Sequence, residues 1–169
     1  MSYEQHQQSS KQIIARCAIV TLSDTRTIDT DKSGARIKEL LTQAGHTIES
    51  YKLIPDDAVE LETILQLLLP RDDIDVVLTN GGTGIARRDN TIPVIDRHLE
   101  IHLPGFGELF RMLSYEQIAS GAMLSRAIGG ISNGKFLFAM PGSTKAVELA
   151  MTKLILPELG HLLGELRKP

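Results

Sequence analysis

The sequence predicts an α/β fold, a three-layer sandwich in which helices cover both faces of a mostly parallel sheet. Three short runs rich in β-branched or aromatic apolar residues have the composition of strands buried on both faces. They lie at residues 17–22, 74–79 and 134–140, and each is followed by a loop and then by apolar residues at helical spacing. Strand, loop and helix repeated in this order are typical of parallel sheets with helices on both sides.

The first half of the chain holds start and end signals for two helices and one further strand. Ser33 is placed to cap a helix, and Gly45 is placed to end it, because glycine tolerates the positive φ of a helix C-terminus. Residues 46–54 alternate loosely between apolar and polar and predict a strand. Asp57 opens a D-x-x-E capping pattern for the next helix, which Pro70 ends.

The second half predicts a short helix at residues 91–98 and a longer helical segment at 105–123. A last helix is capped by Ser143 and kinks or restarts at Pro157. The longer segment and its flanks hold more apolar residues than one helix face needs, so these residues either join the core or form an exposed surface. They are Leu103, Phe106, Leu109, Phe110, Met112, Leu113, Ile118 and Met123.

Length and composition fit one globular domain of 169 residues. Residues 13–169 are predicted to form it, and the polar residues 1–12 to form a flexible tail without the apolar core of a signal peptide. The net charge of −3 excludes a strongly basic nucleic-acid binder, and no apolar run is long enough to span a membrane. The single cysteine, Cys17, cannot form an internal disulfide, so a cytoplasmic protein is expected.

Three loops leave the carboxyl ends of the predicted strands, where open α/β sheets bind their ligands. The loop at 80–84 holds three glycines and Thr83, so several backbone N–H groups can point at one anion. A tight turn explains one or two glycines, whereas three at the end of a buried strand favour phosphate binding. The loop matches neither the P-loop nor the dinucleotide-binding fingerprint. The predicted binding residues of the three loops are Ser23, Asp24, Gly81, Gly82, Thr83, Gly84, Pro141, Gly142, Ser143 and Thr144.

Ser143 and Thr144 place two hydroxyl groups at a predicted helix N-terminus, which is a favourable place for an anion. Taken alone, Ser143 is better explained as an ordinary helix cap. Only convergence of this loop with the glycine loop makes anion binding a competitive explanation.

Two aspartates stand where chemistry can use them. Asp56 lies at the end of the second predicted strand, and Asp89 comes just after the glycine loop. Each has a simpler explanation, because Asp56 can cap the next helix and Asp89 can pair with a neighbouring arginine at the surface. Beside a phosphate-binding loop, however, two carboxylates can hold Mg²⁺, which takes a few carboxylates together with substrate phosphate oxygens.

Other kinds of site are disfavoured. His98 and His102 are four residues apart but lack the H-E-x-x-H order of a zinc protease. Cys17 opens a buried strand and is expected to be an inert core thiol. No G-x-S-x-G motif is present, which argues against acyl-transfer hydrolysis.

Six sequence blocks, taken together and in this order, closely resemble the MoaB/MogA family of molybdenum cofactor biosynthesis proteins. They are V-T-L-S-D-T-R (20–26), I-P-D-D (54–57), T-N-G-G-T-G-I-A-R-R-D-N-T (79–91), G-F-G-E-L-F-R-M-L-S (105–114), L-S-R-A (124–127) and A-M-P-G-S-T-K-A (139–146). The resemblance covers essentially the whole domain, and the fourth and sixth blocks are more similar to the MoaB members. Asn80 departs from the threonine that is common in the family.

This resemblance implies a molybdopterin-binding domain that assembles into a trimer or a hexamer. Active members of the family are adenylyltransferases that use Mg²⁺ and ATP and release pyrophosphate, leaving molybdopterin ready for metal insertion. By motif, Asp56 and Asp89 match the two functional aspartates, expected to be catalytic and to hold Mg²⁺. The glycine loop matches the loop at the pterin and phosphates, and Ser143 and Thr144 match a second anion-binding loop. A molybdenum-insertion protein is a candidate partner.

Two other functions stay open. One is a molybdopterin carrier or assembly protein without catalysis, and the other is a nucleotide-binding regulator that does not need the pterin. Because the chain keeps both Asp56 and Asp89, we expect an active adenylyltransferase. We also expect the surplus apolar residues around 103–124 to supply the contact between subunits, with Phe110 at that contact.

Overall fold

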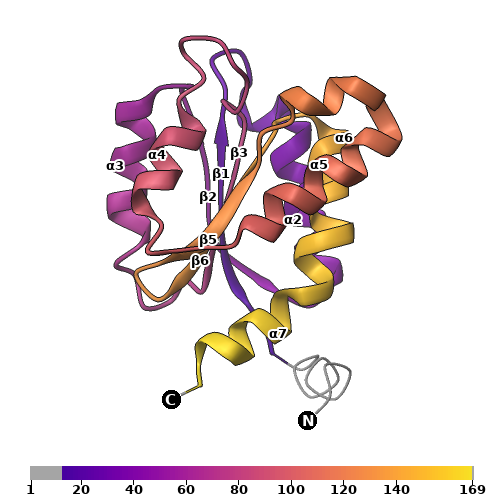
Figure 1. Ribbon diagram of the computed structural model, residues 1–169. Coiled ribbons are helices and arrows are strands. Elements are labelled where there is room, and N and C mark those ends of the chain that lie inside the picture. The colour runs from indigo at the N-terminus through magenta and orange to yellow at the C-terminus, as the bar shows by residue number, and fades with distance from the viewer. Residues whose placement is uncertain (1–12, 169) are drawn as a thin grey trace.

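The computed structural model describes residues 13–168, which form a six-stranded sheet between two layers of helices (Figure 1). The strand order is β2-β1-β3-β6-β5-β4. The predicted α/β sandwich is therefore confirmed, whereas the predicted tail at 1–12 lies outside the described residues. The strands are β1 (Arg16–Leu22), β2 (Thr47–Ile54), β3 (Val76–Asn80), β4 (Ile101–His102), β5 (Ile128–Ser132) and β6 (Lys135–Met140).

Four neighbouring strands, β2, β1, β3 and β6, are parallel, and β5 pairs antiparallel with both β6 and β4. Strands β4 and β5 were not predicted from the sequence. Strand β5 reads I-G-G-I-S, and glycines weaken the apolar pattern of a strand. They are needed here because a Cβ on Gly129 would lie 2.4 Å from the ring of Phe138. The third predicted strand begins at Lys135, since Asn133 and Gly134 form the β5–β6 turn with positive φ.

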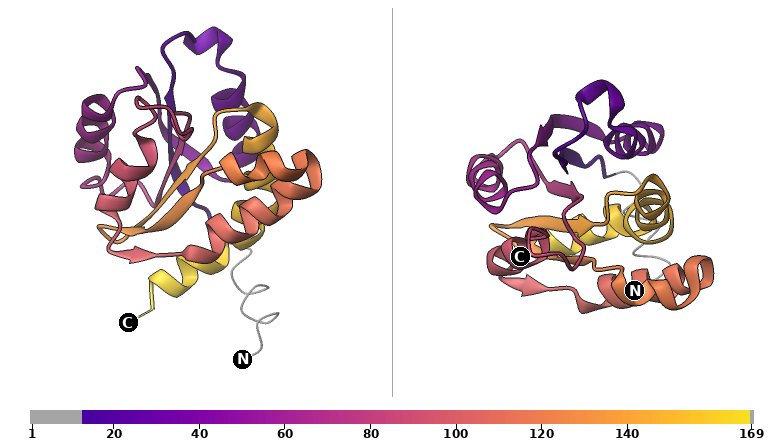
Figure 2. Two further views of the ribbon diagram at one scale, coloured as in Figure 1. Left: turned by 45° about the horizontal axis from the view of Figure 1, so that its top comes forward. Right: turned by 90° about the horizontal axis from the view of Figure 1, so that it is seen from above.

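Helices cover both faces of this sheet (Figures 1 and 2). α3 (Ala58–Leu68) and α4 (Thr91–His98) pack on one face. α2 (Lys32–Gln43), α5 (Pro104–Ile118), α6 (Thr144–Ala150) and α7 (Leu156–Leu166) form the other layer. Alternate residues of β1 enter the two cores, Ile19 on the α2 and α6 side and Val20 on the α3 side.

The helix signals are confirmed with one exception. Asp57 caps α3 by accepting the N–H groups of Val59 and Glu60, and Gly45 ends α2 with a φ of 83°. Ser33 does not cap α2, because the carboxylate of Asp31 accepts the N–H of Gly34 and takes that position. Ser33 is instead buried within the first turn of the helix.

The last predicted helix restarts as expected. A π-helical turn (Met151–Ile155) follows α6 and leads directly into α7. Pro157 stands in the first turn of α7, where a missing N–H is tolerated.

The surplus apolar residues are divided between core and surface. Phe106 and Phe110, one helical turn apart, are buried against the sheet, whereas Leu109, Met112 and Ile118 are exposed. The expectation that Phe110 lies at a contact between subunits is therefore wrong, since its side chain is fully enclosed in the core.

Candidate functional site

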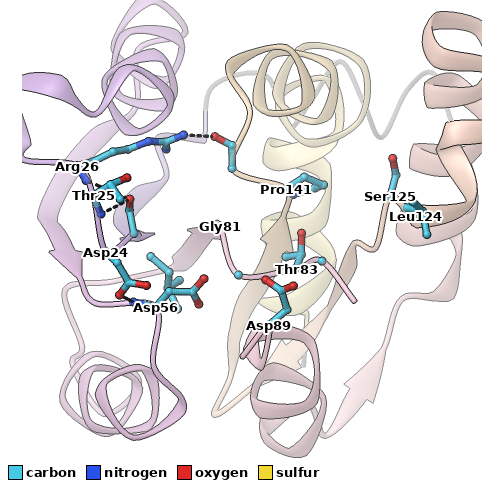
Figure 3. A pocket seen from close by; sticks show the side chains of 15 residues that line it. Asp24, Thr25, Arg26, Asp56, Gly81, Thr83, Asp89, Leu124, Ser125 and Pro141 are labelled. Atoms are coloured by element: carbon cyan, nitrogen blue, oxygen red, sulfur yellow. Dashed lines mark hydrogen bonds between the residues drawn. The ribbon is translucent and has the colours of Figure 1, made fainter. Parts of the chain in front are cut away.

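The loops that follow β1, β3 and β6 meet at the carboxyl ends of the parallel strands. The chain passes from β1 outward to β2 and returns to β3 on the other side of β1, so the strand order reverses there. Ligands of open α/β sheets bind at such a reversal. A pocket of about 510 Å³ opens at this place (Figure 3), within the usual size range of small-molecule sites.

All the predicted site residues except Ser143 and Thr144 line this pocket. Ser143 caps α6 by accepting the N–H of Ala146, which matches its simpler explanation, and it lines a neighbouring cavity. Thr144 is the first residue of α6 and lines neither cavity. The predicted residues that line the pocket are Ser23, Asp24, Asp56, Gly81, Gly82, Thr83, Gly84, Asp89, Pro141 and Gly142. Their roles stay predictions.

Gly82 and Gly84 of the glycine loop leave no room for a side chain. A Cβ on Gly82, whose φ is 63°, would lie 2.4 Å from Asp56 Oδ1 and 2.4 Å from Thr91 Oγ1. A Cβ on Gly84 would lie 2.6 Å from Asp89 Oδ2. The glycines therefore bring the loop backbone directly against both predicted catalytic carboxylates.

The same loop presents backbone donors without acceptors. The hydroxyl and N–H of Thr91 hold the carbonyl oxygens of Gly81 and Gly82 at 2.9 and 3.1 Å. In the part of the chain that the structure describes, the N–H groups of residues 82–85 donate to no protein acceptor. Consecutive N–H groups of this kind are the usual donors of a phosphate-binding loop.

Asp56 carries a carboxylate that the described protein does not satisfy. Its backbone N–H donates to Asp24 Oδ1 at 3.1 Å, but its side chain accepts no hydrogen bond from a described residue. Burial raises the pKa of Asp56, and the negative charges of Asp89 and Asp24 raise it further. Asp89 is oriented by the N–H of Ala86, which donates to Oδ2 at 2.8 Å.

The carboxylates of Asp56 and Asp89 fit Mg²⁺ that arrives with a phosphorylated ligand. Asp56 lies against Gly82 and Asp89 lies against Gly84, and the mutual repulsion of the two carboxylates is the kind that a cation relieves (Figure 3). Among residues 13–168, no group of three or more His, Cys, Asp or Glu side chains is arranged to hold a metal ion. Mg²⁺ commonly takes one or two carboxylates plus substrate phosphates, so the pair suits it in that form.

Arg26 ties two of the loops together and was not predicted as a site residue. One terminal nitrogen donates to the carbonyl oxygen of Gly142 at 3.0 Å (Figure 3). The other donates to Ser33 Oγ at 2.6 Å. The backbone N–H of Arg26 in turn donates to Ser23 Oγ at 3.2 Å. The loop after β1 and the loop after β6 are thereby held against each other.

Next to the pocket, four polar residues form a group here named the Asp31 cluster: the buried Thr21, Asp31 and Asn80 and the half-buried Tyr51. The side chain of Asp31 is inaccessible and accepts the Tyr51 hydroxyl at 2.7 Å and the N–H of Gly34 at 3.1 Å. Burial alone would raise the pKa of Asp31, but donated hydrogen bonds outweigh it and lower the pKa. Asn80 Nδ2 donates to Thr21 Oγ1 at 2.8 Å.

A second cavity of about 660 Å³ adjoins the pocket between α5 and α6 and shares Ser125 and Pro141 with it. Ser143, Lys145 and Lys153 are among its lining residues. The two cavities meet at the two shared residues, Ser125 and Pro141.

The remaining candidates have separate roles in the structure. His98 contacts Glu62 at 2.9 Å, and His102 contacts Asp96 at 2.8 Å, so the two histidines point to different partners. Burial raises the pKa of the Cys17 thiol to about 12, which keeps it unreactive. Within the described range, every helix is too short or too polar to cross a lipid bilayer.

Fold and pocket together define an α/β protein in which a glycine loop and two carboxylates face one ligand pocket. Residues 18–161 match the family described as "Probable molybdopterin binding domain". Because this match spans most of the chain, the chain belongs to that family, in agreement with the sequence resemblance. Membership places it among the proteins of molybdenum cofactor biosynthesis.

Relatives support this assignment along the whole chain. Two proteins named "Molybdenum cofactor biosynthesis protein B", from Bacillus anthracis and Halalkalibacterium halodurans, are 54% and 51% identical over 169 residues, 99% of each chain. A crystal structure of a protein with that name is 54% identical, with a TM-score of 0.90 over 93% of this chain and 98% of its own. The tungsten cofactor synthesizing protein MoaB from Pyrococcus furiosus is 36% identical, with a TM-score of 0.83 over 92% and 98%.

Proposed function

We propose that the protein binds molybdopterin and adenylylates it with Mg-ATP, releasing pyrophosphate. One observation carries the proposal: the N–H groups of residues 82–85 have no acceptor among the described residues, and Gly82, Thr83 and Gly84 line the same pocket as Asp56 and Asp89. Donors for phosphate oxygens beside ligands for a cation suit a metal-bound nucleotide. The family and the names of the relatives supply the pterin as the second substrate.

In the proposed reaction, an oxygen of the terminal pterin phosphate attacks the α-phosphorus of ATP. A new P–O bond forms, the bond from that phosphorus to the bridging oxygen breaks, and pyrophosphate leaves with the electron pair. Such a transfer needs in-line positioning and neutralisation of charge more than it needs a covalent nucleophile. Mg²⁺, when bound with the nucleotide, would supply that neutralisation.

The residues of the chain have distinct parts in this reaction. The N–H groups of residues 82–85 bind phosphate oxygens and hold the nucleotide in place. Asp56 and Asp89, which lie against Gly82 and Gly84 of the glycine loop, would hold the metal ion. Arg26 keeps the loop at Gly142 close to the loop after β1, so that the pocket keeps its width.

The test is a product assay with purified protein, molybdopterin, ATP and MgCl₂, in which adenylylated pterin is detected by mass spectrometry and pyrophosphate by its release. We expect product that disappears when Mg²⁺ is chelated. Asp89→Asn should lower the rate by about a hundredfold or more while the variant stays folded. Asp72→Asn, at an exposed aspartate before β3, is the matched control and should leave the rate unchanged.

The same assay separates the alternatives. Wild-type protein that binds molybdopterin but forms no adenylylated product would contradict the proposal and identify a carrier. Binding of ATP without any need for the pterin would identify a nucleotide-binding regulator. Full activity of a folded Asp89→Asn variant would remove that carboxylate from the reaction.

We also propose that the protein is a homo-oligomer, a trimer or a hexamer. α5 and the short 3-10 helix after it (Ala119–Leu124) expose apolar side chains on one segment, which is unusual for a monomer. Light scattering during gel filtration should give a mass well above the 18.6 kDa of one chain. Met112→Asp should dissociate the assembly, whereas Val59→Asp on the exposed face of α3 should not. The exposed side chains are Leu109, Met112, Tyr115, Ile118, Met123 and Leu124.

A further inference from the structure

Arg126 contacts the glycine loop from outside the pocket. It lies between the 3-10 helix and β5, and it is not among the residues that line the pocket. Its Nε donates to the carbonyl oxygen of Thr83 at 2.9 Å, and its Nη2 donates to the carbonyl oxygens of Gly84 and, at 3.3 Å, Asp89. One side chain thus holds three peptide groups around the loop that the proposed function needs.

These contacts fix which way the loop peptides point. In a trans peptide the C=O and the following N–H point in opposite directions. Because Arg126 holds the carbonyl oxygens of Thr83 and Gly84, the N–H groups of Gly84 and Ile85 are turned away from the guanidinium. Neither N–H has an acceptor among the described residues, so both are free for a ligand, and Gly84 lines the pocket.

The charge of Arg126 adds to this effect. In the described part of the chain its hydrogen bonds all go to backbone carbonyl oxygens, and no carboxylate pairs with it. An unpaired guanidinium on a carbonyl oxygen polarises the peptide, which makes its N–H a stronger donor. A lysine has a point charge and no planar fork, so it cannot span the same set of carbonyl oxygens.

We propose that Arg126 is a positioning residue that sets the anion affinity of the glycine loop without touching the anion. The inference rests on the proposed function only in taking the ligand to be phosphorylated. Arg126→Ala and Arg126→Lys should each weaken the binding of inorganic pyrophosphate by about tenfold or more, because loop peptides that are free to rotate must be ordered on binding.

The experiment measures pyrophosphate affinity by titration calorimetry and loop order by ¹⁵N relaxation at residues 82–85. In both variants we expect weaker binding and greater mobility of the free loop, with the melting temperature close to that of wild type. Arg97→Ala, at an exposed arginine of α4, is the matched control and should change neither quantity. The lysine variant also retains the positive charge and tests the role of geometry alone.

Chemical rescue distinguishes positioning from general damage. N-ethylguanidinium can replace the atoms that Arg126→Ala removes, so it should restore pyrophosphate binding, whereas ethylammonium should not. Unchanged affinity and loop order in Arg126→Ala, or failure of rescue, would overturn the inference. So would wild-type protein that binds no pyrophosphate. If rescue succeeds but wild-type protein forms no adenylylated pterin, the proposed function fails and the role of Arg126 stands.

Discussion

Asp31 is buried and Asp56 is half-buried in the same part of the molecule, yet folding moves their pKa values in opposite directions. Burial opposes ionisation of both. In the Asp31 cluster, hydrogen bonds from Thr21, Tyr51 and the N–H of Gly34 outweigh burial and lower the pKa of Asp31. In the pocket, the pKa of Asp56 is raised by burial and then by the charges of its neighbours, of which Asp89 is the strongest.

The difference separates a carboxylate that serves the fold from one that is left for a ligand. A satisfied buried carboxylate stabilises the folded state while it is ionised, whereas an unsatisfied one destabilises it. Carboxylates of the second kind gather at functional sites, where a cation or a proton completes them. The Asp31 cluster therefore supports the fold, and under the proposed function the pocket carboxylates would bind the cation of a metal-bound nucleotide.

The largest expected effect on stability is that of Asp31→Asn. The substitution removes a buried charge that accepts hydrogen bonds from Tyr51, Ser33 and Gly34 and faces Arg26, and it should lower the free energy of unfolding by about 3 kcal/mol. Urea unfolding at pH 7 measures the loss. Asp29→Asn, at an exposed aspartate two residues earlier, should change stability by less than about 0.5 kcal/mol.

Tyr51→Phe should lower the free energy of unfolding by less than Asp31→Asn does. It leaves the Asp31 carboxylate in place but removes one donor, which should cost about 1.5 kcal/mol. The stability from Asp31 should be fully present above the unfolded pKa of about 3.9 and lost as pH falls through the lower folded value. Equal stability of Asp31→Asn and wild type would show that the cluster does not support the fold.

The parallel half of the fold was predictable because β1, β3 and β6 contain short apolar runs, and β2 alternates loosely between apolar and polar residues. The antiparallel edge was not, since β4 has two residues and β5 places two glycines where strands usually have large side chains. The face of α5 that carries Phe110 could have been assigned from the spacing of Phe106 and Phe110, one turn apart. A surplus of apolar residues alone does not say which face is buried.

The position of the pocket could be predicted from the topology, because loops at the carboxyl ends of neighbouring parallel strands lie close together. The two arginines that hold these loops could not be found in this way. Arg26 reaches a carbonyl oxygen 116 residues away, and Arg126 reaches one 43 residues away. A local pattern shows a charged residue in a loop, but it does not show which distant backbone group receives the hydrogen bond.

Carboxyl-carbon NMR titration of wild-type protein labelled with ¹³C-aspartate most directly tests whether the Asp56 carboxylate is available to bind a cation. Without Mg²⁺, the pKa of Asp56 should lie above the ordinary value of about 3.9 and that of Asp31 below it. Excess MgCl₂, added together with ATP, should lower the pKa of Asp56, because a nearby cation favours the ionised form, and should leave Asp31 unchanged. An Asp56 that titrates at the ordinary value and does not respond to Mg²⁺ would contradict the claim.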